Sequence, residues 1–483
     1  MRSNNHGYSV SLLSSLCVAS IIVFLMVSGH FCDLMSFSAS NSSQYSVPLL
    51  ELQEKLIKDN QVSAIHSTTS NTTTRNVIRN IPRNIKTRSK QSREQEMEQG
   101  LARARASISR AVASKRSLSS TLKSNHYVPS GLVYRNPIAF YQSYMEMERR
   151  FKVHVYSEGE SPLTHDGPCK DIYSIEGRFI HEMEQGLGAA GRFKTKDPHR
   201  AHVHFMPFSV TWMVKYLYEP NSYNLTPLRQ FVSDYVRVIS TKYPFWNRTH
   251  GADHFMLACH DWGPHASQGN PFLYNTSIRV LCNANTSEGF NPQKDVSLPE
   301  IHLYGGNVSV KLLTPPPANA SRPYLAFFAG GVHGPIRPIL LNHWKNVDND
   351  LQVYEYLPKE LDYYSFMLQS KFCLCPSGHE VASPRIVEAI YAQCVPVILS
   401  QDYVLPFSDV LKWEEFSIQV DVSDIPMLKK LLSAVPEERY RRLKEGVRVV
   451  RRHFVSNHPP ERFDVFHMIL HSVWLRRINV KLD

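Results

Sequence analysis

Short apolar strands and amphipathic helices alternate along most of this 483-residue chain. In its first half, helical spacing at 139–150, 178–185 and 228–239 is interleaved with apolar runs at 151–156, 201–208, 254–260 and 278–282. Behind a Pro-rich stretch, the alternation restarts with strands expected at 324–331, 351–357, 371–378 and 395–400. Because such alternation is typical of parallel sheets covered by helices, the pattern predicts an α/β fold with two domains facing a cleft.

The segment before these domains has a different composition. Residues 10–32 contain no Asp, Glu, Lys or Arg, over about the 20 residues that a helix needs to cross a bilayer. We expect a signal anchor here instead of a cleavable signal peptide, because the apolar run is too long and no A-x-A site follows. Residues 1–9 are then a cytoplasmic tail. The Ser-, Thr- and Asn-rich segment 33–124 is predicted to be a stem, followed by domains at 125–315 and 316–483.

Glycosylation sequons and cysteines indicate an oxidising compartment. Six of the N-x-S/T sequons lie between residues 224 and 319, a density that favours a lumenal body. The sequons begin at Asn41, Asn71, Asn224, Asn247, Asn275, Asn285, Asn307 and Asn319. Six cysteines outside the span form an even set that can make disulfides. Cys373 and Cys375 would point the same way on one strand, so they are not expected to pair with each other.

The formal net charge of +11 suits an anionic partner but does not identify one. Much of the excess lies within residues 75–123, where a solvated basic helix is the favoured interpretation. The predicted compartment and the absence of a recognisable binding motif argue against a nucleic-acid partner.

The stretch CPSGHEVASPRIVEAIYAQCVPVIL, residues 375–399, places a small-residue turn before a helix and then a strand. Ser383 is expected to cap the helix, and Pro384 suits its first turn. Backbone N–H groups at such a helix start suit a diphosphate. Arg385 and Glu388 would share one helix face. We interpret them as ligand-binding residues, with an ordinary surface ion pair as the alternative.

This stretch resembles the exostosin-like glycosyltransferases of family 47, and their plant members in particular. The resemblance extends through GPCKDIYSIEGRF, DPHRAHVHFMPFSV, HGADHFMLACHDWG and DVFHMILHSVWLRRIN, and covers residues 134–479. The stem segment LARARASISRA is similar to the plant subgroup that contains pectin xylosyltransferase-like proteins. The resemblance implies a GT-B fold with two Rossmann-like domains and a single-pass type II Golgi membrane protein. It further implies transfer of a sugar from a UDP-linked donor to a cell-wall glycan, with inversion.

The resemblance also assigns residues to the donor. It places Glu388 at the ribose, and it places Arg385 and Ser383 at the diphosphate. The turn of Ser377, Gly378 and His379 belongs to the same diphosphate-facing part. A second phosphate-facing loop follows the strand at 324–331, with Gly330 and Gly331 in the turn and Arg337 at the start of a helix. Arg337 is expected to stabilise the leaving group.

Titratable side chains crowd the segment GADHFMLACHDWGPH. Asp261 is the predicted catalytic base, and His260 is the second candidate. Asp253, His254 and Glu176 are predicted to bind the acceptor. Structural roles for several of them are the competing interpretation.

The expected partners are a nucleotide sugar, a polysaccharide acceptor and the membrane, with an oligomer of glycosyltransferases left open. No cofactor is expected, and no metal is required, because two arginines face the phosphates. The D-x-D-like Asp348–Asp350 precedes a strand instead of following one. The alternative function is a catalytically silent glycan-binding or scaffolding subunit.

Overall fold

The computed structural model describes residues 84–114, 127–186, 190–314, 316–317 and 319–479. The chain divides into two compact units, residues 1–92 and 93–483, and the account below concerns the second. The predicted tail and span (1–32), together with Asn41 and Asn71, lie outside the described residues. Within the described ranges, no helix combines the length and the apolar character that crossing a bilayer requires.

The first sheet has five parallel strands in the order β1-β2-β3-β4-β5. Their bounds are β1 Val153–Val155, β2 Val203–Phe205, β3 His254–Ala258, β4 Ile278–Leu281 and β5 Val296–Ser297. Helix α6 (Ser174–Gln185) covers one face, where Phe179 meets Phe205 at 5.4 Å between ring centroids. Helix α8 (Thr226–Lys242) contributes Val232 and Val236 to a separate apolar cluster that also contains Met256 of β3. Every residue of β3 is buried. A strand buried on both faces has a mostly apolar sequence, and this pattern is why β3 could be predicted.

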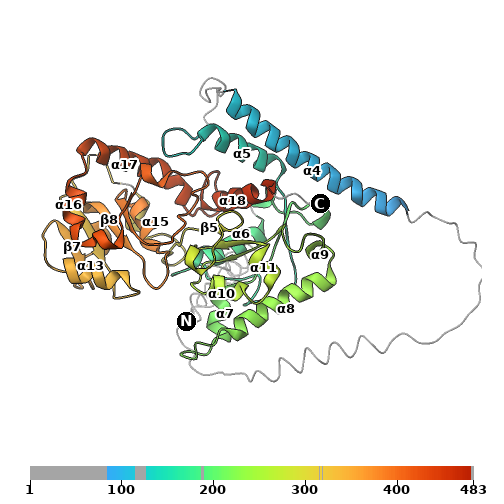
Figure 1. The fold of residues 1–483 in the computed structure, drawn as a ribbon, viewed down its shortest axis with the longest axis horizontal. Coiled ribbons are helices and arrows are strands. Elements are labelled where there is room, and N and C mark those ends of the chain that lie inside the picture. Colours follow the sequence, from blue (N-terminus) through green and yellow to red (C-terminus); the bar gives the residue numbers. More distant parts are fainter. Residues whose placement is uncertain (1–83, 115–126, 187–189, 315, 318, 480–483) are drawn as a thin grey trace, which may run out of the picture. The chain divides into compact units, whose positions relative to one another are not determined.

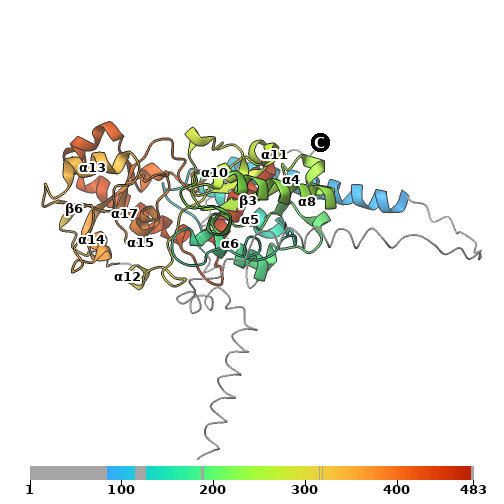
Figure 2. The same ribbon diagram turned by 90° about the horizontal axis from the view of Figure 1, so that it is seen from below.

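The second sheet is also parallel, with the order β10-β9-β8-β6-β7. Its strands are β6 Tyr324–Ala329, β7 Leu351–Tyr354, β8 Ser370–Pro376, β9 Val395–Leu399 and β10 Ile418–Gln419. Figures 1 and 2 show α13 (Ile336–Trp344) and α15 (Pro384–Tyr391) grouped with these strands. The strand order reverses between β6 and β8, and ligands of such sheets bind at this reversal, beyond the carboxyl ends of the strands. The predicted α/β fold class with two parallel sheets is confirmed.

The last described helix, α18 (Val465–Asn479), packs on the first sheet although it follows the second in the chain. In Figure 1 it is the red helix beside α5 (Pro137–Arg150). The Trp474 ring meets Phe151 at 5.5 Å between centroids, and the Arg477 Nε donates to the His202 carbonyl at 2.7 Å. The end of the predicted domain 316–483 therefore contacts the first half of the body, and the predicted domain bounds stay a prediction.

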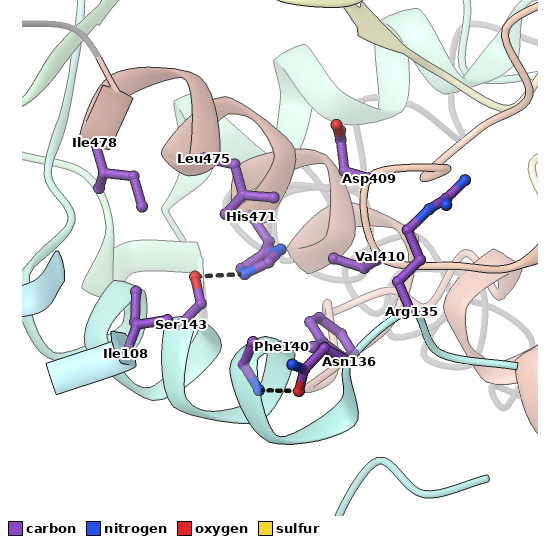
Figure 3. A pocket seen from close by; sticks show the side chains of 11 residues that line it. Ile108, Arg135, Asn136, Phe140, Ser143, Asp409, Val410, His471, Leu475 and Ile478 are labelled. Carbon is purple, nitrogen blue, oxygen red and sulfur yellow. Dashed lines mark hydrogen bonds between the residues drawn. The ribbon is translucent and has the colours of Figure 1, made fainter. Parts of the chain in front are cut away.

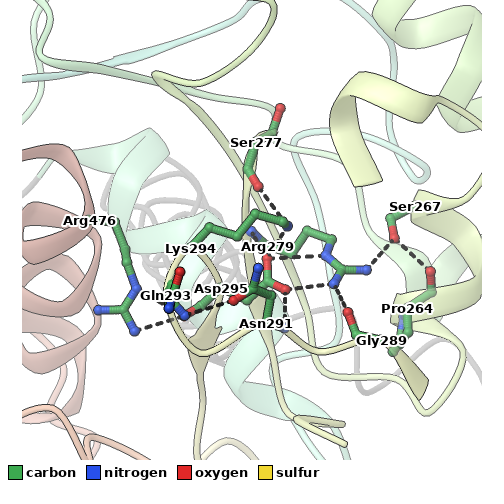
Figure 4. Close-up of polar contacts among 10 residues, drawn as sticks. All are labelled: Pro264, Ser267, Ser277, Arg279, Gly289, Asn291, Gln293, Lys294, Asp295 and Arg476. Atoms are coloured by element: carbon green, nitrogen blue, oxygen red, sulfur yellow. Dashed lines mark hydrogen bonds and ion pairs between the residues drawn. The ribbon is translucent and has the colours of Figure 1, made fainter. Parts of the chain in front are cut away.

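A buried ion pair ties α18 to β4 and β5 (Figure 4). Arg279 of β4 and Asp295 are both fully buried, and the Arg279 Nη2 lies 2.6 Å from an Asp295 carboxylate oxygen. The same Nη2 donates to the Gly289 carbonyl, also at 2.6 Å. From α18, the Arg476 Nη2 donates to the Asp295 carbonyl at 2.8 Å. A buried charge pair with these added hydrogen bonds is costly to break from one side only.

Residues 93–113 of α4 (Asn84–Ala113) pack on the body, although they fall in the predicted stem. Leu101 and Ala104 are fully buried, and their spacing of three places both on one helix face. Glu98 pairs with the fully buried Arg477 at 2.7 Å. A solvated basic helix was the expected structure within this part of the stem. The helix is present, but Leu101, Ala104 and the Glu98 ion pair show that one face of it packs on the body.

An apolar cavity of about 170 Å³ lies between α4, α5 and α18 (Figure 3). Ile108 of α4 lines one side and Leu475 of α18 another. His471, fully buried, shares a 3.0 Å hydrogen bond between its Nε2 and the Ser143 Oγ. Burial lowers the pKa of His471 to about 3, so the ring is neutral and fits these apolar surroundings.

Disulfides join neighbouring strands in both sheets. Cys259 follows β3 and pairs with Cys282, which follows β4. Cys373 of β8 pairs with Cys394, which precedes β9, while Cys375 is buried with a free thiol. The prediction that Cys373 and Cys375 do not pair with each other is confirmed.

Candidate active site

The loops after β6 and β8 touch each other where the strand order reverses. Gly334 in the first loop has φ +67°, and a Cβ there would lie 1.8 Å from the Gly378 carbonyl oxygen in the second. Only glycine fits this contact without a shift of the backbone. Gly330 is similarly constrained, because an added Cβ would lie 2.8 Å from an Arg385 guanidinium nitrogen. The predicted glycine turns therefore bring the two loops and a cation together.

Arg385 lies in the first turn of α15 with 8% of its surface exposed. Its Nη2 donates to the Ala329 carbonyl at 2.8 Å, and its Nε donates to the Tyr363 hydroxyl at 3.2 Å. The guanidinium stacks on the Phe328 ring at 4.6 Å. Its Nη1 is buried, and no described residue accepts a hydrogen bond from it. An unsatisfied N–H on a fixed, buried cation is suited to an anionic ligand.

Arg337, in the first turn of α13, is the second cation at this point. Its Nη1 makes a long hydrogen bond of 3.4 Å to the Gly331 carbonyl, and its buried Nε has no acceptor among the described residues. Burial lowers the pKa of Arg337 to about 10, and repulsion from Arg385 adds to the effect. Among the described residues, neither of these two neighbouring guanidinium groups forms an ion pair with a carboxylate. A bound anion would therefore stabilise both.

Glu388 stands one turn further along α15, with 9% of its surface exposed. The Tyr363 hydroxyl donates to one carboxylate oxygen at 3.2 Å, and the Tyr364 hydroxyl donates to the other at 3.1 Å. Burial raises the pKa of Glu388, while Arg385 acts to lower it. The carboxylate is thus held in one orientation by two tyrosines of α14 (Tyr363–Gln369), which the sequence did not reveal as site residues.

The remaining predicted donor residues lie in the same loops. The Ser383 hydroxyl accepts from the Arg385 N–H, and α15 begins at Pro384, so the predicted helix cap is confirmed. The Ser377 hydroxyl donates to the Ser400 Oγ at 2.7 Å and is occupied within the protein. The exposed His379 lies close enough to Asp261 for their charges to interact.

Asp261, the predicted base, follows β3 and faces the second sheet's loops. Its carboxylate accepts from the Tyr173 hydroxyl at 2.9 Å. Burial raises the pKa of Asp261, and the nearby charge of His379 opposes this rise. The loop after β3 therefore brings this carboxylate to the junction between the two sheets.

Glu300 is a further carboxylate at this junction, and sequence reasoning missed it. It is 5% exposed. Burial raises its pKa well above the ordinary value, and the charge of Asp261 adds to that rise, while Arg337 opposes it. The signal in the sequence was an acidic residue shortly after the short strand β5, but a two-residue strand is hard to recognise.

His260, the second candidate for the base, has one ring nitrogen occupied within the protein, and its catalytic role stays a prediction. Its Nδ1 accepts a hydrogen bond from the Trp262 N–H at 3.1 Å, so the neutral ring carries its proton on Nε2. Burial lowers the pKa of His260 to about 4. The ring would have to give up the Trp262 bond to accept a proton.

The three residues predicted to bind the acceptor are buried and make polar contacts within the protein, and their role at the acceptor stays a prediction. Glu176 is fully buried, and its carboxylate accepts from the Ser209 hydroxyl at 2.5 Å and the Cys259 N–H at 2.7 Å. Asp253, 1% exposed, pairs with Arg248 at 2.7 Å. His254, fully buried, lies 2.8 Å from the Tyr156 hydroxyl. Asp253 and His254 stand at the amino end of β3, away from the strand end that bears Asp261.

The D-x-D-like residues Asp348 and Asp350 both form ion pairs with one lysine. Lys429 Nζ lies 2.5 Å from Asp348 and 3.0 Å from Asp350. Among the described residues no group of three or more His, Cys, Asp or Glu is arranged to hold a metal. The expectation that no metal is required stays a prediction.

Five predicted glycosylation sites in the described body are exposed. These are Asn224, Asn247, Asn275, Asn307 and Asn319. Asn285 differs in exposure, because it is half-buried. Its Nδ2 donates to Glu288 at 3.0 Å, and the Nδ2 of the exposed Asn247 likewise donates to the Ser240 carbonyl at 2.8 Å. Burial therefore makes Asn285 less accessible to a glycan than the other five.

The fold is α/β, and the loops at the strand-order reversal present two guanidinium groups and an oriented carboxylate, which suit an anionic ligand. The model of the exostosin GT47 domain matches residues 147–435, and the chain belongs to this glycosyltransferase family. A "probable glycosyltransferase" of Arabidopsis thaliana is 63% identical over 383 residues, which cover 79% of this chain and 78% of that protein. The expected family is confirmed, and the protein is a glycosyltransferase.

More distant relatives are named for the transfer of different sugars. A "probable beta-1,4-xylosyltransferase" of Arabidopsis thaliana is 30% identical over 261 residues. The aligned region covers 49% of this chain and 61% of that protein. A "probable glucuronosyltransferase" of Oryza sativa subsp. japonica is 30% identical as well, with 49% of this chain and 58% of that protein covered.

Proposed function

We propose that this chain moves a sugar from a UDP-linked donor to a plant cell-wall polysaccharide, pectin or hemicellulose, with inversion at the anomeric carbon. Membership of the glycosyltransferase family supports a nucleotide-sugar donor and a glycan acceptor. The relatives named as xylosyl- and glucuronosyltransferases support a pentose or a uronic acid as the sugar, and they leave the choice open.

The observation that carries this proposal is the pair of guanidinium groups at the strand-order reversal, with Arg385 buried and Arg337 half-buried. Arg337 and Arg385 each retain a buried N–H without an acceptor among the described residues. A diphosphate would satisfy both and would relieve their mutual repulsion. Glu388, oriented by Tyr363 and Tyr364, is then placed to accept hydrogen bonds from a ribose diol.

In the proposed reaction, an acceptor hydroxyl oxygen attacks the anomeric carbon from the face opposite the diphosphate. The new C–O bond forms as the bond to the β-phosphate oxygen breaks, which inverts the configuration. The bonding electrons stay with UDP, and Arg337 and Arg385 stabilise the charge that develops there. The acceptor proton passes to a carboxylate of the first sheet's loops, Asp261 or Glu300. Burial raises the pKa of each, so that each carboxylate, once ionised, binds a proton more strongly than an exposed one does.

The proposed location is the Golgi lumen, with a single-pass type II anchor at residues 10–32. The apolar run without charges and the exposed sequons support this location. The disulfides Cys259–Cys282 and Cys373–Cys394 support an oxidising compartment. Assembly with other glycosyltransferases is a further part of the proposal that rests on the resemblance alone.

The proposal is tested by incubating the full-length protein with UDP-xylose, UDP-galactose, UDP-arabinose and UDP-glucuronic acid, each with wall oligosaccharides, and measuring UDP release. We expect release with at least one donor, and a loss of at least about 100-fold in Glu388→Ala. Glu355→Ala is the control, because this acid pairs with Lys345 on the surface. A wild type that binds oligosaccharides but neither binds nor turns over any donor would support the scaffolding alternative instead.

The base is identified by comparing Asp261→Asn with Glu300→Gln. Each variant keeps the shape of the side chain and removes its ability to accept the proton. The base variant is expected to lose transfer while its affinity for UDP stays within about twofold of wild type. Equal activity of both variants and wild type would show that neither carboxylate is the base.

A further inference from the structure

A row of aromatic rings leads away from Asp261 across three loops of the first half of the body. Tyr173, whose hydroxyl donates to Asp261, lies 4.9 Å from His260 between ring centroids. His260 lies 5.4 Å from Trp262, and Trp262 lies 4.7 Å from Tyr218. Each ring thus contacts the next, and the row begins at a candidate catalytic carboxylate.

The rings come from separate elements and are held in place. Tyr173 precedes α6, His260 and Trp262 follow β3, and Tyr218 follows α7 (Val210–Leu217). All four are half-buried, and Trp262 and Tyr218 pack on the apolar cluster beneath α8. One part of each ring is therefore fixed by packing, while another part remains accessible to a ligand. Because aromatic side chains have few rotatable bonds, little entropy would be lost when a ligand covers them.

The chemistry of the row suits a sugar chain. One face of a pyranose ring presents several C–H groups, which carry partial positive charge and match the negative face of an aromatic ring. The row contains no Lys or Arg, so it would bind through ring contacts and buried apolar area instead of charge. A row of several rings suits a ligand with several consecutive sugars better than a single one.

We propose that Trp262 and Tyr218 form the outer part of an acceptor subsite, on which the sugars next to the reacting residue of a glycan chain stack. This inference rests on the proposed function, because it assumes that the acceptor hydroxyl reacts near Asp261. Trp262 and Tyr218 are positioning residues here. They select a chain of sugars over a monosaccharide and hold its end toward the reaction centre.

The test measures the affinity of the full-length protein for β-1,4-xylohexaose, for α-1,4-hexagalacturonate, for the corresponding monosaccharides and, separately, for UDP. Wild type is expected to bind at least one hexamer more tightly than its monosaccharide. Trp262→Ala and Tyr218→Ala should each weaken that binding about tenfold, with UDP affinity within about twofold of wild type. Trp262→Phe, which keeps a ring, should recover part of the affinity. Phe272→Ala is the control, because Phe272 is 47% exposed on α11 (Pro271–Asn275) and lies outside the row.

Salt gives a second readout. Affinity for the uncharged xylohexaose through the row should be insensitive to added NaCl, whereas UDP affinity, which depends on Arg337 and Arg385, should fall. Hexagalacturonate is left out of this readout because it carries charges of its own. The inference is overturned if wild type binds neither hexamer, or if both alanine variants bind like wild type. UDP affinity confirms that each variant is folded. Trp262-dependent hexamer binding in a protein that binds no UDP or UDP-sugar would overturn the proposed function and leave the row intact.

Discussion

At the scale of single residues, Arg337 is a cation placed where the folded protein gains little from its charge. It lies beside Arg385, and burial together with that neighbour lowers its pKa to about 10. We expect Arg337→Ala to reduce transfer about 100-fold, as removal of one fixed charge-stabilising donor does in other enzymes. The melting temperature of the unliganded variant should equal or exceed that of wild type, because a like-charge repulsion is removed. Calorimetry and UDP release check both parts, and a melting temperature several degrees lower would show a structural role.

Glu380, in the loop after β8, makes stability depend on pH. Burial raises its pKa from 4.5 to about 8, and the nearby carboxylates of Glu288 and Asp261 contribute. A carboxyl whose pKa is raised by folding contributes stability that is complete below about pH 4.5 and is lost as the pH rises through about 8. Glu380→Gln should therefore melt like wild type at pH 4 and at a higher temperature at pH 8. Glu355→Gln is the control, and an equal shift at both pH values would contradict the assignment.

At the scale of elements, much of the alternation of strands and helices could be predicted from the sequence, because fully buried strands such as β3 and β9 are mostly apolar runs between turns. The two-residue strands β5 and β10 are too short to leave such a pattern. Ser383 and Pro384 marked the start of α15 because helix caps are local signals. Glu300, Tyr363 and Tyr364 were missed because each reaches the site through the fold and carries no local motif.

Helix α4 supports a prediction about truncation. Leu101 and Ala104 fill space in the core, and Glu98 pairs with buried Arg477. A chain that begins at residue 125 should therefore melt at a lower temperature than one that begins at residue 84, since burial of Leu101 alone contributes about 2 kcal/mol. Leu101→Asp in the longer chain should reproduce the loss, with the exposed Arg103 changed to Asp as the control. Equal melting temperatures for the two chains would show that α4 does not stabilise the body.

At the scale of the whole molecule, the first sheet is packed against a helix, α18, that follows the second sheet in the chain. Removal of residues 465–483 deletes α18, whose Trp474 and Arg477 pack on the first half of the body. We expect limited proteolysis of this shortened chain to cut within residues 127–314 before it cuts within 319–464. The full-length chain serves as the reference. Cleavage confined to the second half would show that α18 does not support the first sheet.

The packing of α18 on the first sheet has a consequence for biosynthesis. The first half of the body leaves the ribosome before the second sheet does, but α18, which packs on its core, is translated only after that sheet. Until then, the side chains that will meet Trp474 have no cover, and such transiently exposed apolar surface is prone to aggregate. A stop codon that removes α18 would accordingly damage the half of the enzyme that was made first.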